Sequence, residues 1–162
     1  MPILAIGAFA GLRESEIKRL DWHEVNLRRG YIEVKAEKAK TAKRRIVRIQ
    51  PNLAQWLAPY AAFAGSVVPV NARKKLDAVR QEARLNHWSK NGLRHSFASY
   101  RYAATNDAAA VAAELGLSTT EMLFNTYREL VLPEEAERYW KIGPESGMAE
   151  NVVAFTASVQ LE

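Results

Sequence analysis

The sequence predicts a mixed α+β domain that is mainly helical and carries a small antiparallel sheet. Most of the chain places apolar residues at helical spacing, in segments long enough to form helices. Residues 31–49 depart from this pattern, because two short alternating runs flank a basic turn, which is typical of a β-hairpin. With 162 residues, of which 48% are hydrophobic, the chain has the size of one domain and can bury a core.

Composition narrows the class of protein. The net charge of +5 favours a polyanionic partner. The absence of cysteine excludes disulfides, thiolate catalysis and cysteine zinc sites, and it fits a reducing cytosol. The apolar run from Pro2 to Leu12 is too short to cross a bilayer and lacks the features of a signal peptide, so we expect no membrane association. The sequence contains no convincing cluster of metal ligands, and we expect no metal or other cofactor.

The first half of the chain is predicted to form two helices and the hairpin. The first helix has an apolar face over residues 3–9 and ends at Gly11. A second helix begins at Arg13, followed by acidic residues that suit a first helical turn. After a polar connection come two strands, over residues 31–34 and 46–49.

Arg13 has two interpretations. A cation at the start of a helix opposes the helix dipole. Arg13 is therefore either an exposed residue paired with Glu14 or Glu16, or it is directed at a bound anion that the helix N–H groups also attract.

The turn of the predicted hairpin is unusually basic. Lysines commonly cover exposed strand edges, which is one explanation. Seven cations accompanied only by Glu37 exceed that need, so contact with a phosphate backbone is the other. The cations are Lys35, Lys38, Lys40, Lys43, Arg44, Arg45 and Arg48.

The second half is predicted to be helical apart from one short strand. An amphipathic helix spans residues 51–63, and Gly65–Val70 is the expected third strand. Asp107 is placed to cap an alanine-rich helix that ends at Gly116. An S-T-T-E sequence resembling a capping box opens a later helix. The remaining helices are expected over residues 71–84, 90–104, 118–127 and 133–140.

Four segments, taken in order, resemble the catalytic domain of the tyrosine recombinases, the phage integrase family. G-L-R-E-S-E-I-K-R-L-D-W resembles the box around the family's first catalytic arginine, here Arg13. K-T-A-K-R-R-I-V resembles the hairpin that carries the family's lysine, here Lys40. N-G-L-R-H-S-F-A-S resembles the second box, with Arg94, and L-G-L-S-T-T-E-M-L-F-N-T-Y resembles the segment ending in the nucleophile, here Tyr127. The resemblance covers Pro2 to Leu132.

The resemblance implies a recombinase that cuts and rejoins DNA through a 3′-phosphotyrosyl intermediate. Arg13 and Arg94 would hold the scissile phosphate. Tyr127 would attack phosphorus, and Lys40 would protonate the leaving oxygen. No cofactor is implied. The expected contacts with double-stranded DNA come from Lys38, Lys43, Arg44, Arg45, Arg73, Lys74 and Lys90.

The resemblance also sets expectations about organisation. It implies an integrase-type catalytic domain with a small three-stranded antiparallel sheet, which we place at residues 1–142. A tail follows at residues 143–162 and ends in a Leu-Glu pair typical of a vector remnant. We expect the family's N-terminal core-binding domain to lie upstream of this sequence. A monomer that forms a tetramer on DNA, in the cytoplasm of a bacterial or phage-infected cell, is implied as well.

Two positions depart from the family pattern. Asn91 stands where the second box usually has histidine, and it can donate a hydrogen bond but cannot shuttle a proton. Leu117 stands where histidine or tryptophan is usual, and it can donate nothing. We therefore expect weaker transition-state stabilisation. His95 adjoins Arg94 on another face of the helix and is interpreted as a half-buried packing residue rather than a replacement.

Two alternative functions remain. One is a degenerate family member that binds DNA without cleaving it, which Asn91 and Leu117 would explain. The other is a helical DNA-binding regulator without this chemistry. The regulator hypothesis predicts that four residues are not clustered in space: Arg13, Lys40, Arg94 and Tyr127.

Overall fold

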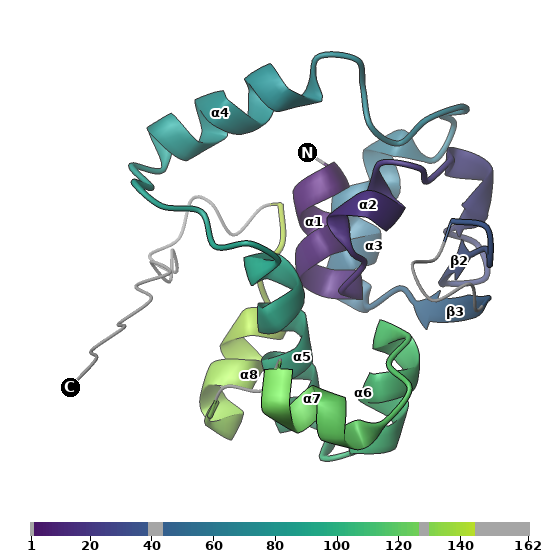
Figure 1. The fold of residues 1–162 in the computed structure, drawn as a ribbon. Coiled ribbons are helices and arrows are strands. Elements are labelled where there is room, and N and C mark those ends of the chain that lie inside the picture. Colours follow the sequence, from purple (N-terminus) through teal and green to yellow (C-terminus); the bar gives the residue numbers. More distant parts are fainter. Residues whose placement is uncertain (1, 39–43, 127–129, 145–162) are drawn as a thin grey trace.

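Helix α1 (Pro2–Ala10) is the element around which the others are arranged (Figure 1). The computed structural model describes residues 2–38, 44–126 and 130–144. The other elements are α2 (Glu14–Ile17), η1 (Trp22–Glu24), β1 (Val25–Asn26), β2 (Tyr31–Val34), β3 (Arg45–Arg48), α3 (Pro51–Leu57), η2 (Ala58–Tyr60), α4 (Ala72–Glu82), α5 (Gly92–Thr105), α6 (Ala108–Leu115), α7 (Thr120–Thr126) and α8 (Pro133–Trp140). The mainly helical α+β prediction is confirmed.

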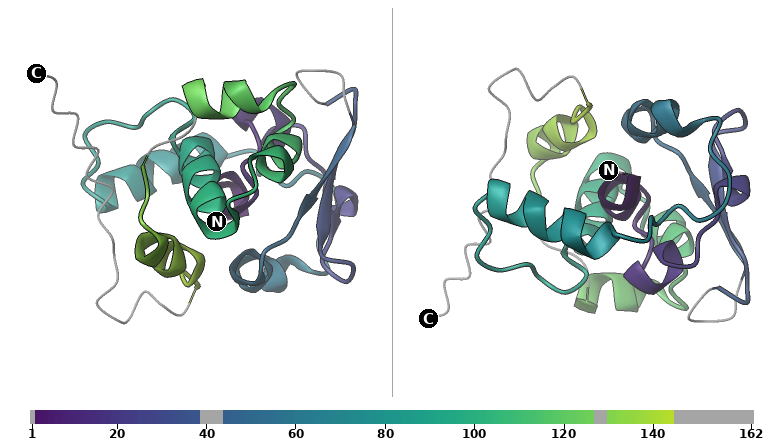
Figure 2. Two further views of the ribbon diagram at one scale, coloured as in Figure 1. Left: turned by 90° about the horizontal axis from the view of Figure 1, so that it is seen from below. Right: turned by 90° about the horizontal axis from the view of Figure 1, so that it is seen from above.

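The sheet has three antiparallel strands in the order β1-β2-β3, and Figure 2 shows it on the opposite side of α1 from α8. Ile32 lies in the middle strand, opposite Val25 on one side and Val47 on the other. All three side chains are buried against the core. This register turns one face of the sheet toward α1 and leaves the other face, which includes Ile46 and Arg48, exposed.

The predicted third strand at Gly65–Val70 is wrong, because β1 fills that role. The 65–70 segment forms one isolated bridge, between Asp21 and Ser66. The segment follows the backbone of residues 20–22, where Trp22 N donates to Gly65 O at 2.9 Å. Pro69 then supplies no N–H to extend the pairing.

Two hydrophobic clusters form the core. The larger one is built by α1, the sheet and α3. The smaller one lies between α5, α6 and α7, with Phe97, Leu115 and Leu123 at its centre. Trp140 of α8 packs against both clusters, and the Tyr139 hydroxyl donates to Ala8 O at 2.6 Å. Helix α8 thereby ties the end of the domain to α1.

Two glycines end helices close to the predicted site. Gly11 follows α1 at φ +62°, and a Cβ there would lie 2.4 Å from the Phe97 ring. Gly116 ends α6 at φ +64°, with Leu117 N donating to Ala112 O at 2.8 Å as in a Schellman motif. Both positions therefore require glycine conformationally, and Gly11 requires it sterically as well.

The helix caps agree with the prediction at one position and differ at another. The Asp107 side chain accepts from Ala110 N at 2.9 Å, as expected for a cap. Helix α7, by contrast, begins one residue later than the S-T-T-E pattern predicts. The Thr119 hydroxyl accepts from Met122 N at 3.3 Å and takes the capping position instead of Ser118.

Helix α4 stands apart from the rest of the fold (Figure 1). Ala72 at its start is buried, and its other residues are exposed or half-buried. A cleft of about 550 Å³ separates α4 from α1 and the start of α5. Among the described residues, no helix is long and apolar enough to span a bilayer.

Candidate active site

Arg13 stands at the start of α2 with extended backbone, φ −68° and ψ 147°. Its main-chain N–H donates to Glu16 Oε2 at 2.8 Å, and its Nη1 donates to Glu16 Oε1 at 3.2 Å. Glu16 thus satisfies an N–H group that the helix start leaves unpaired, as the acidic residue of a capping box does. The expected pairing of Arg13 is present, but its side chain is largely buried rather than exposed.

Glu16 also receives a second arginine, from the sheet. Arg45 Nη1 donates to Glu16 Oε1 at 3.0 Å and Arg45 Nη2 donates to Oε2 at 2.7 Å. Such a bidentate pair fixes both the distance and the plane of the two groups. Burial raises the pKa of Glu16, but the hydrogen bonds and charges of Arg45 and Arg13 outweigh it, so the pKa lies below its usual value. The carboxylate is ionised at neutral pH.

Arg45 makes a third bond to the helical half of the molecule. Its Nε donates to Glu114 O at 2.9 Å, at the last turn of α6, and its side chain is 8% exposed. Arg45 was expected to contact DNA. In the structure it is largely buried and donates hydrogen bonds to Glu16 and Glu114.

Arg94, on α5, bonds to the end of α6 and to the connection between α1 and α2. It is 1% exposed; its Nη1 donates to Gly11 O at 2.6 Å and its Nη2 to Leu115 O at 2.7 Å. The carbonyls at the end of α6 lack partners within the helix and carry the negative end of its dipole, so two arginines suit this position. Arg94 thereby connects the residue two before Arg13 with the residue two before Leu117. We call the meeting point of Arg13, Glu16, Arg45, Arg94 and the end of α6 the arginine junction.

The two unusual residues occupy different surroundings. Leu117 is half-buried and packs against the cluster around Phe97, where it offers no hydrogen-bond donor. Asn91 precedes α5 at φ +60° and is exposed, and its carbonyl accepts from His95 N at 3.0 Å. His95 is half-buried, as expected from its place on the helix.

Three of the predicted residues, Lys40, Lys43 and Tyr127, lie outside the described residues. Their described neighbours are Lys38 and Arg44 on the hairpin and Thr126 at the end of α7. The structure therefore links the surroundings of Arg13 and Arg94, whereas the clustering of Lys40 and Tyr127 with them stays a prediction.

Two of the cations flanking the hairpin turn pair with Glu24 of η1, and a third pairs with Glu33 of β2. Lys38 Nζ donates to Glu24 Oε2 at 2.8 Å, and Lys35 Nζ lies 3.4 Å from Glu24 Oε1. Burial raises the pKa of Glu24, but its bonds to Lys38 and to the Asp21 N–H outweigh this effect, and the pKa is lowered. Arg44 is 68% exposed, with Nε 2.7 Å from an oxygen of Glu33.

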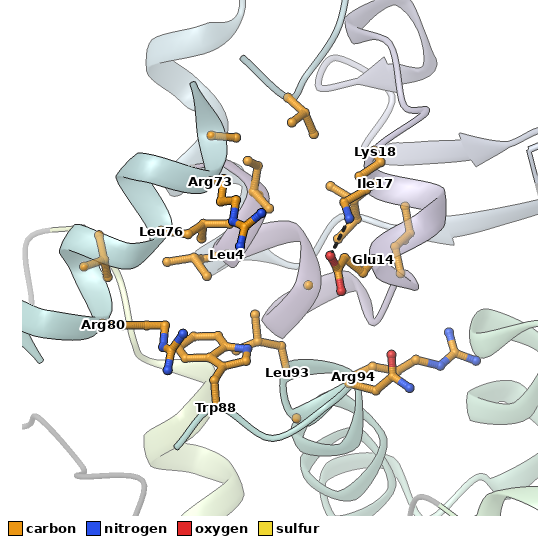
Figure 3. Close-up of a pocket in the computed structure, with 18 of the residues that line it drawn as sticks. Leu4, Glu14, Ile17, Lys18, Arg73, Leu76, Arg80, Trp88, Leu93 and Arg94 are labelled. Atoms are coloured by element: carbon orange, nitrogen blue, oxygen red, sulfur yellow. Dashed lines mark ion pairs between the residues drawn. The ribbon is translucent and has the colours of Figure 1, made fainter. Parts of the chain in front are cut away.

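Of the other expected DNA contacts, Arg73 lines the cleft beside α4. Arg73 and Lys74 are exposed on α4, and Lys90 is exposed just before α5. Figure 3 shows apolar side chains lining the cleft, with Arg73 on one wall and Arg94 at the opposite edge, extending away from it. The cleft and the arginine junction are therefore separate features that share the start of α5.

Sequence reasoning gave Glu16 as one of two possible partners of Arg13, but did not predict that Glu16 is buried and shared with a second arginine. The signal for Glu16 was its spacing of three residues from Arg13 at a helix start, the geometry of a capping box. No local pattern signals that Arg45 pairs with Glu16, because 29 residues separate them. Among the described residues, no group of three histidines or acids could hold a metal ion.

The fold is similar to that of solved recombinase and integrase structures. A search of curated protein sequences gives no match. The crystal structure of XerA recombinase matches with a TM-score of 0.66 and 21% identity, covering 85% of this chain and 54% of that one. The catalytic domain of bacteriophage HP1 integrase matches with a TM-score of 0.59 and 21% identity, covering 94% and 82%. The chain thus spans about half the length of XerA recombinase.

The family profile described as "Phage integrase family" matches residues 3–131. This match includes both arginine boxes and the segment that ends in Tyr127. The chain belongs to the phage integrase family.

Proposed function

We propose that this domain recombines DNA at specific sites, cutting and rejoining it through a covalent bond between Tyr127 and a 3′-phosphate. The observation that carries the proposal is the arginine junction. There Arg94 donates to the carbonyl of Gly11, two residues before Arg13, although the two arginines expected to hold the phosphate are far apart in the sequence. The match to the integrase family supports the same assignment.

The proposed reaction exchanges one phosphate ester for another. The Tyr127 oxygen attacks phosphorus, and the bond from phosphorus to the 5′-oxygen breaks. Lys40 gives that oxygen its proton, which leaves a free 5′-hydroxyl. The new ester bond to tyrosine retains the energy of the bond that was broken. A 5′-hydroxyl can therefore attack the tyrosyl phosphate and rejoin the strand without another energy source.

The arginine junction supplies positive charge where this reaction needs it. Negative charge develops on the phosphate oxygens as phosphorus becomes five-coordinate, and buried, preorganised arginines stabilise such charge well. Arg13 is held by Glu16, and Arg94 is held by two main-chain carbonyls.

A degenerate, DNA-binding member of the family is the second candidate, favoured by Asn91 and Leu117. The half-buried Leu117 side chain cannot donate to a phosphate oxygen. Loss of one such donor commonly lowers the rate by about a hundredfold. An experiment must therefore distinguish a slow recombinase from a protein that only binds DNA.

DNA binding is assigned to the basic side chains around the site. Arg44, Arg73, Lys74 and Lys90 are exposed, and Lys38 is partly exposed. With Lys43, they form the proposed phosphate contacts, assisted by Arg45 only indirectly. We take residues 1–142 as the catalytic domain, residues 143–162 as its tail, and a tetramer on DNA as the active form of a cytoplasmic protein that is monomeric when isolated.

The test is a search for the covalent adduct. The protein and its Tyr127→Phe variant are incubated with a pool of nicked duplexes of random sequence, in which strand loss after cleavage prevents rejoining. Protein–DNA adducts are then recovered after denaturation. Adducts made by the wild-type protein and absent with Tyr127→Phe support a recombinase, whereas retained DNA without adducts supports the binding protein.

Salt dependence tests the assigned DNA contacts separately. Phosphate contacts release counterions, so affinity for duplex DNA is expected to be weak and to fall by at least about tenfold between 50 and 200 mM salt. Titration by fluorescence anisotropy measures it. Affinity that does not change with salt would contradict the assignment.

A further inference from the structure

We propose that Arg45 is a positioning residue, which sets the orientation of Arg13 through Glu16. The inference rests on the proposed function, because it assigns Arg13 to the scissile phosphate. The structure shows how such an effect is transmitted, since Arg13 and Arg45 both donate to Glu16 Oε1, at 3.2 and 3.0 Å.

The first step is the fixed plane of the Glu16 carboxylate. Arg45 holds both carboxylate oxygens with two parallel N–H groups, at 3.0 and 2.7 Å. A side chain with one donor point would leave the carboxylate free to rotate. Because Glu16 in turn receives both the Arg13 N–H and the Arg13 guanidinium, its plane determines where that guanidinium lies.

The second step is the anchor of Arg45 itself. Its Nε donates to Glu114 O at 2.9 Å, so the guanidinium is fixed at both ends. Gly116 leaves the space through which this side chain passes, because a Cβ there would lie 3.1–3.2 Å from three Arg45 atoms. The guanidinium therefore connects β3 to the end of α6 as well as to α2.

The third step is the position of Arg45 in the chain. It opens β3, directly after the hairpin turn that contains Lys40. It reaches α6 just before Leu117 and the segment that leads to Tyr127. Arg45 thus lies next to three of the four parts of the chain that carry the proposed chemistry, all but α5, and its effect is on their alignment rather than on the DNA.

Arg45→Lys is the informative variant, because it keeps the charge and removes the paired donors. A small misplacement of a catalytic group can cost about a hundredfold in rate. We expect the single-turnover rate of adduct formation at saturating DNA to fall by about 10- to 100-fold. The dissociation constant for DNA is expected to stay within about twofold, since the Arg45 side chain is 8% exposed.

Arg101→Lys is the matched control. Arg101 makes a bidentate pair of its own, with Nε and Nη2 each 3.0 Å from an oxygen of Glu114, and it is also partly buried. Within the described part of the chain, its bonds do not extend to Glu16 or Arg13. The variant therefore disrupts a similar ion pair close by. Its single-turnover rate of adduct formation, divided by the fraction of active protein given by the burst amplitude, is expected to equal that of the wild type.

A neutral phosphate separates positioning from general loosening of the fold. A methylphosphonate at the cleavage site lacks one charged oxygen, so the orientation of Arg13 matters less. The Arg45→Lys defect is expected to shrink to under about threefold on this substrate. A defect of equal size on both substrates overturns the inference, as does a normal rate on the natural phosphate.

Two further outcomes are distinguishable. Glu16→Asp keeps the carboxylate charge but shortens the side chain that connects Arg45 with Arg13. If Arg45→Lys yields no folded protein, the same measurements are made on Glu16→Asp. The expected and the contradicting results are the same. If the wild-type protein forms no adduct at all, the proposed function fails and the inference fails with it. If the wild type reacts and the variants react equally fast, only the inference fails.

Discussion

Two buried glutamates of this domain are built alike and held differently. Glu16 accepts the main-chain N–H of Arg13 at 2.8 Å, and Glu24 accepts that of Asp21 at 2.9 Å, in both cases from three residues earlier. Each also binds cations from beside the basic hairpin turn. The partners of Glu16 are arginines inside the arginine junction, whereas those of Glu24 are lysines at the edge of the sheet.

The difference is one of geometry and of access to water. The side chains of Arg13 and Arg45 are 14% and 8% exposed, and those of Lys35 and Lys38 are 38% and 21% exposed. An arginine pair fixes a plane, whereas a lysine is a mobile point charge. The same local motif thus gives a rigid junction next to the proposed site, and ion pairs with mobile, more exposed lysines beside the sheet.

Neutralising the two glutamates gives the largest contrast. Glu16→Gln leaves two largely buried arginines without their anion and is expected to lower the free energy of unfolding by about 3–5 kcal/mol. Glu24→Gln is expected to cost only about 1 kcal/mol, because its lysines can turn into water. Urea unfolding measures both. Equal costs would show that the two sites do not differ in the way described.

Two glycines provide a steric version of the same comparison. Gly11, whose carbonyl binds Arg94, has φ +62°, and a Cβ added there would lie 2.4 Å from Phe97. Gly30, in the turn before β2, has φ +72° and open space around it. We expect Gly11→Ala to cost about 2–4 kcal/mol and Gly30→Ala about 1 kcal/mol, by thermal unfolding. A larger loss at Gly30 would refute this.

Acid should weaken the junction through its carboxylate. The pKa of Glu16 is lower in the folded state than its usual 4.5, so the stability it contributes is present above that value and is lost as the pH falls through the folded pKa. As the pH falls below 4.5, the wild type should therefore lose more stability than Glu16→Gln. Denaturant titrations at each pH measure this, and parallel curves would count against it.

The smallest effect on stability is expected at Arg44, the neighbour of Arg45. Its ion pair with Glu33 is at the surface, with the Arg44 side chain 68% exposed. Arg44→Ala should change the free energy of unfolding by less than about 0.5 kcal/mol. It should also reduce the slope of log affinity against log salt concentration by about 0.9, the value for one phosphate contact. An unchanged slope in the salt titration would remove Arg44 from the DNA contacts.

Local patterns were sufficient for most of the helices. Gly11, Asp107 and Gly116 mark helix ends through backbone conformation and capping, which depend on near neighbours. The third strand was missed because Val25–Asn26 is too short to show alternation, and its pairing with Tyr31 and Ile32 is what makes it a strand.

The site was predictable as a set of motifs but not as a structure. Arg13 and Arg94 were identified by the boxes around them, and the structure brings their surroundings together. The role of Arg45 could not be predicted, since a basic hairpin suggests DNA contact equally for Arg44 and Arg45. Successive side chains in extended backbone point to opposite faces, so Arg44 lies at the surface and Arg45 reaches Glu16. Only the packed fold shows which of the two is buried.

The bonds of the arginine junction also constrain when it can form. Arg94 reaches Gly11 across 83 residues, and Arg45 reaches Glu114 across 69. Contacts between such distant parts of a chain form late, after the cost of closing long loops has been met. A nascent polypeptide that ends before Glu114 lacks one acceptor of each arginine, the Glu114 carbonyl for Arg45 and the Leu115 carbonyl for Arg94, so an incomplete translation product has no complete junction with which to hold a phosphate.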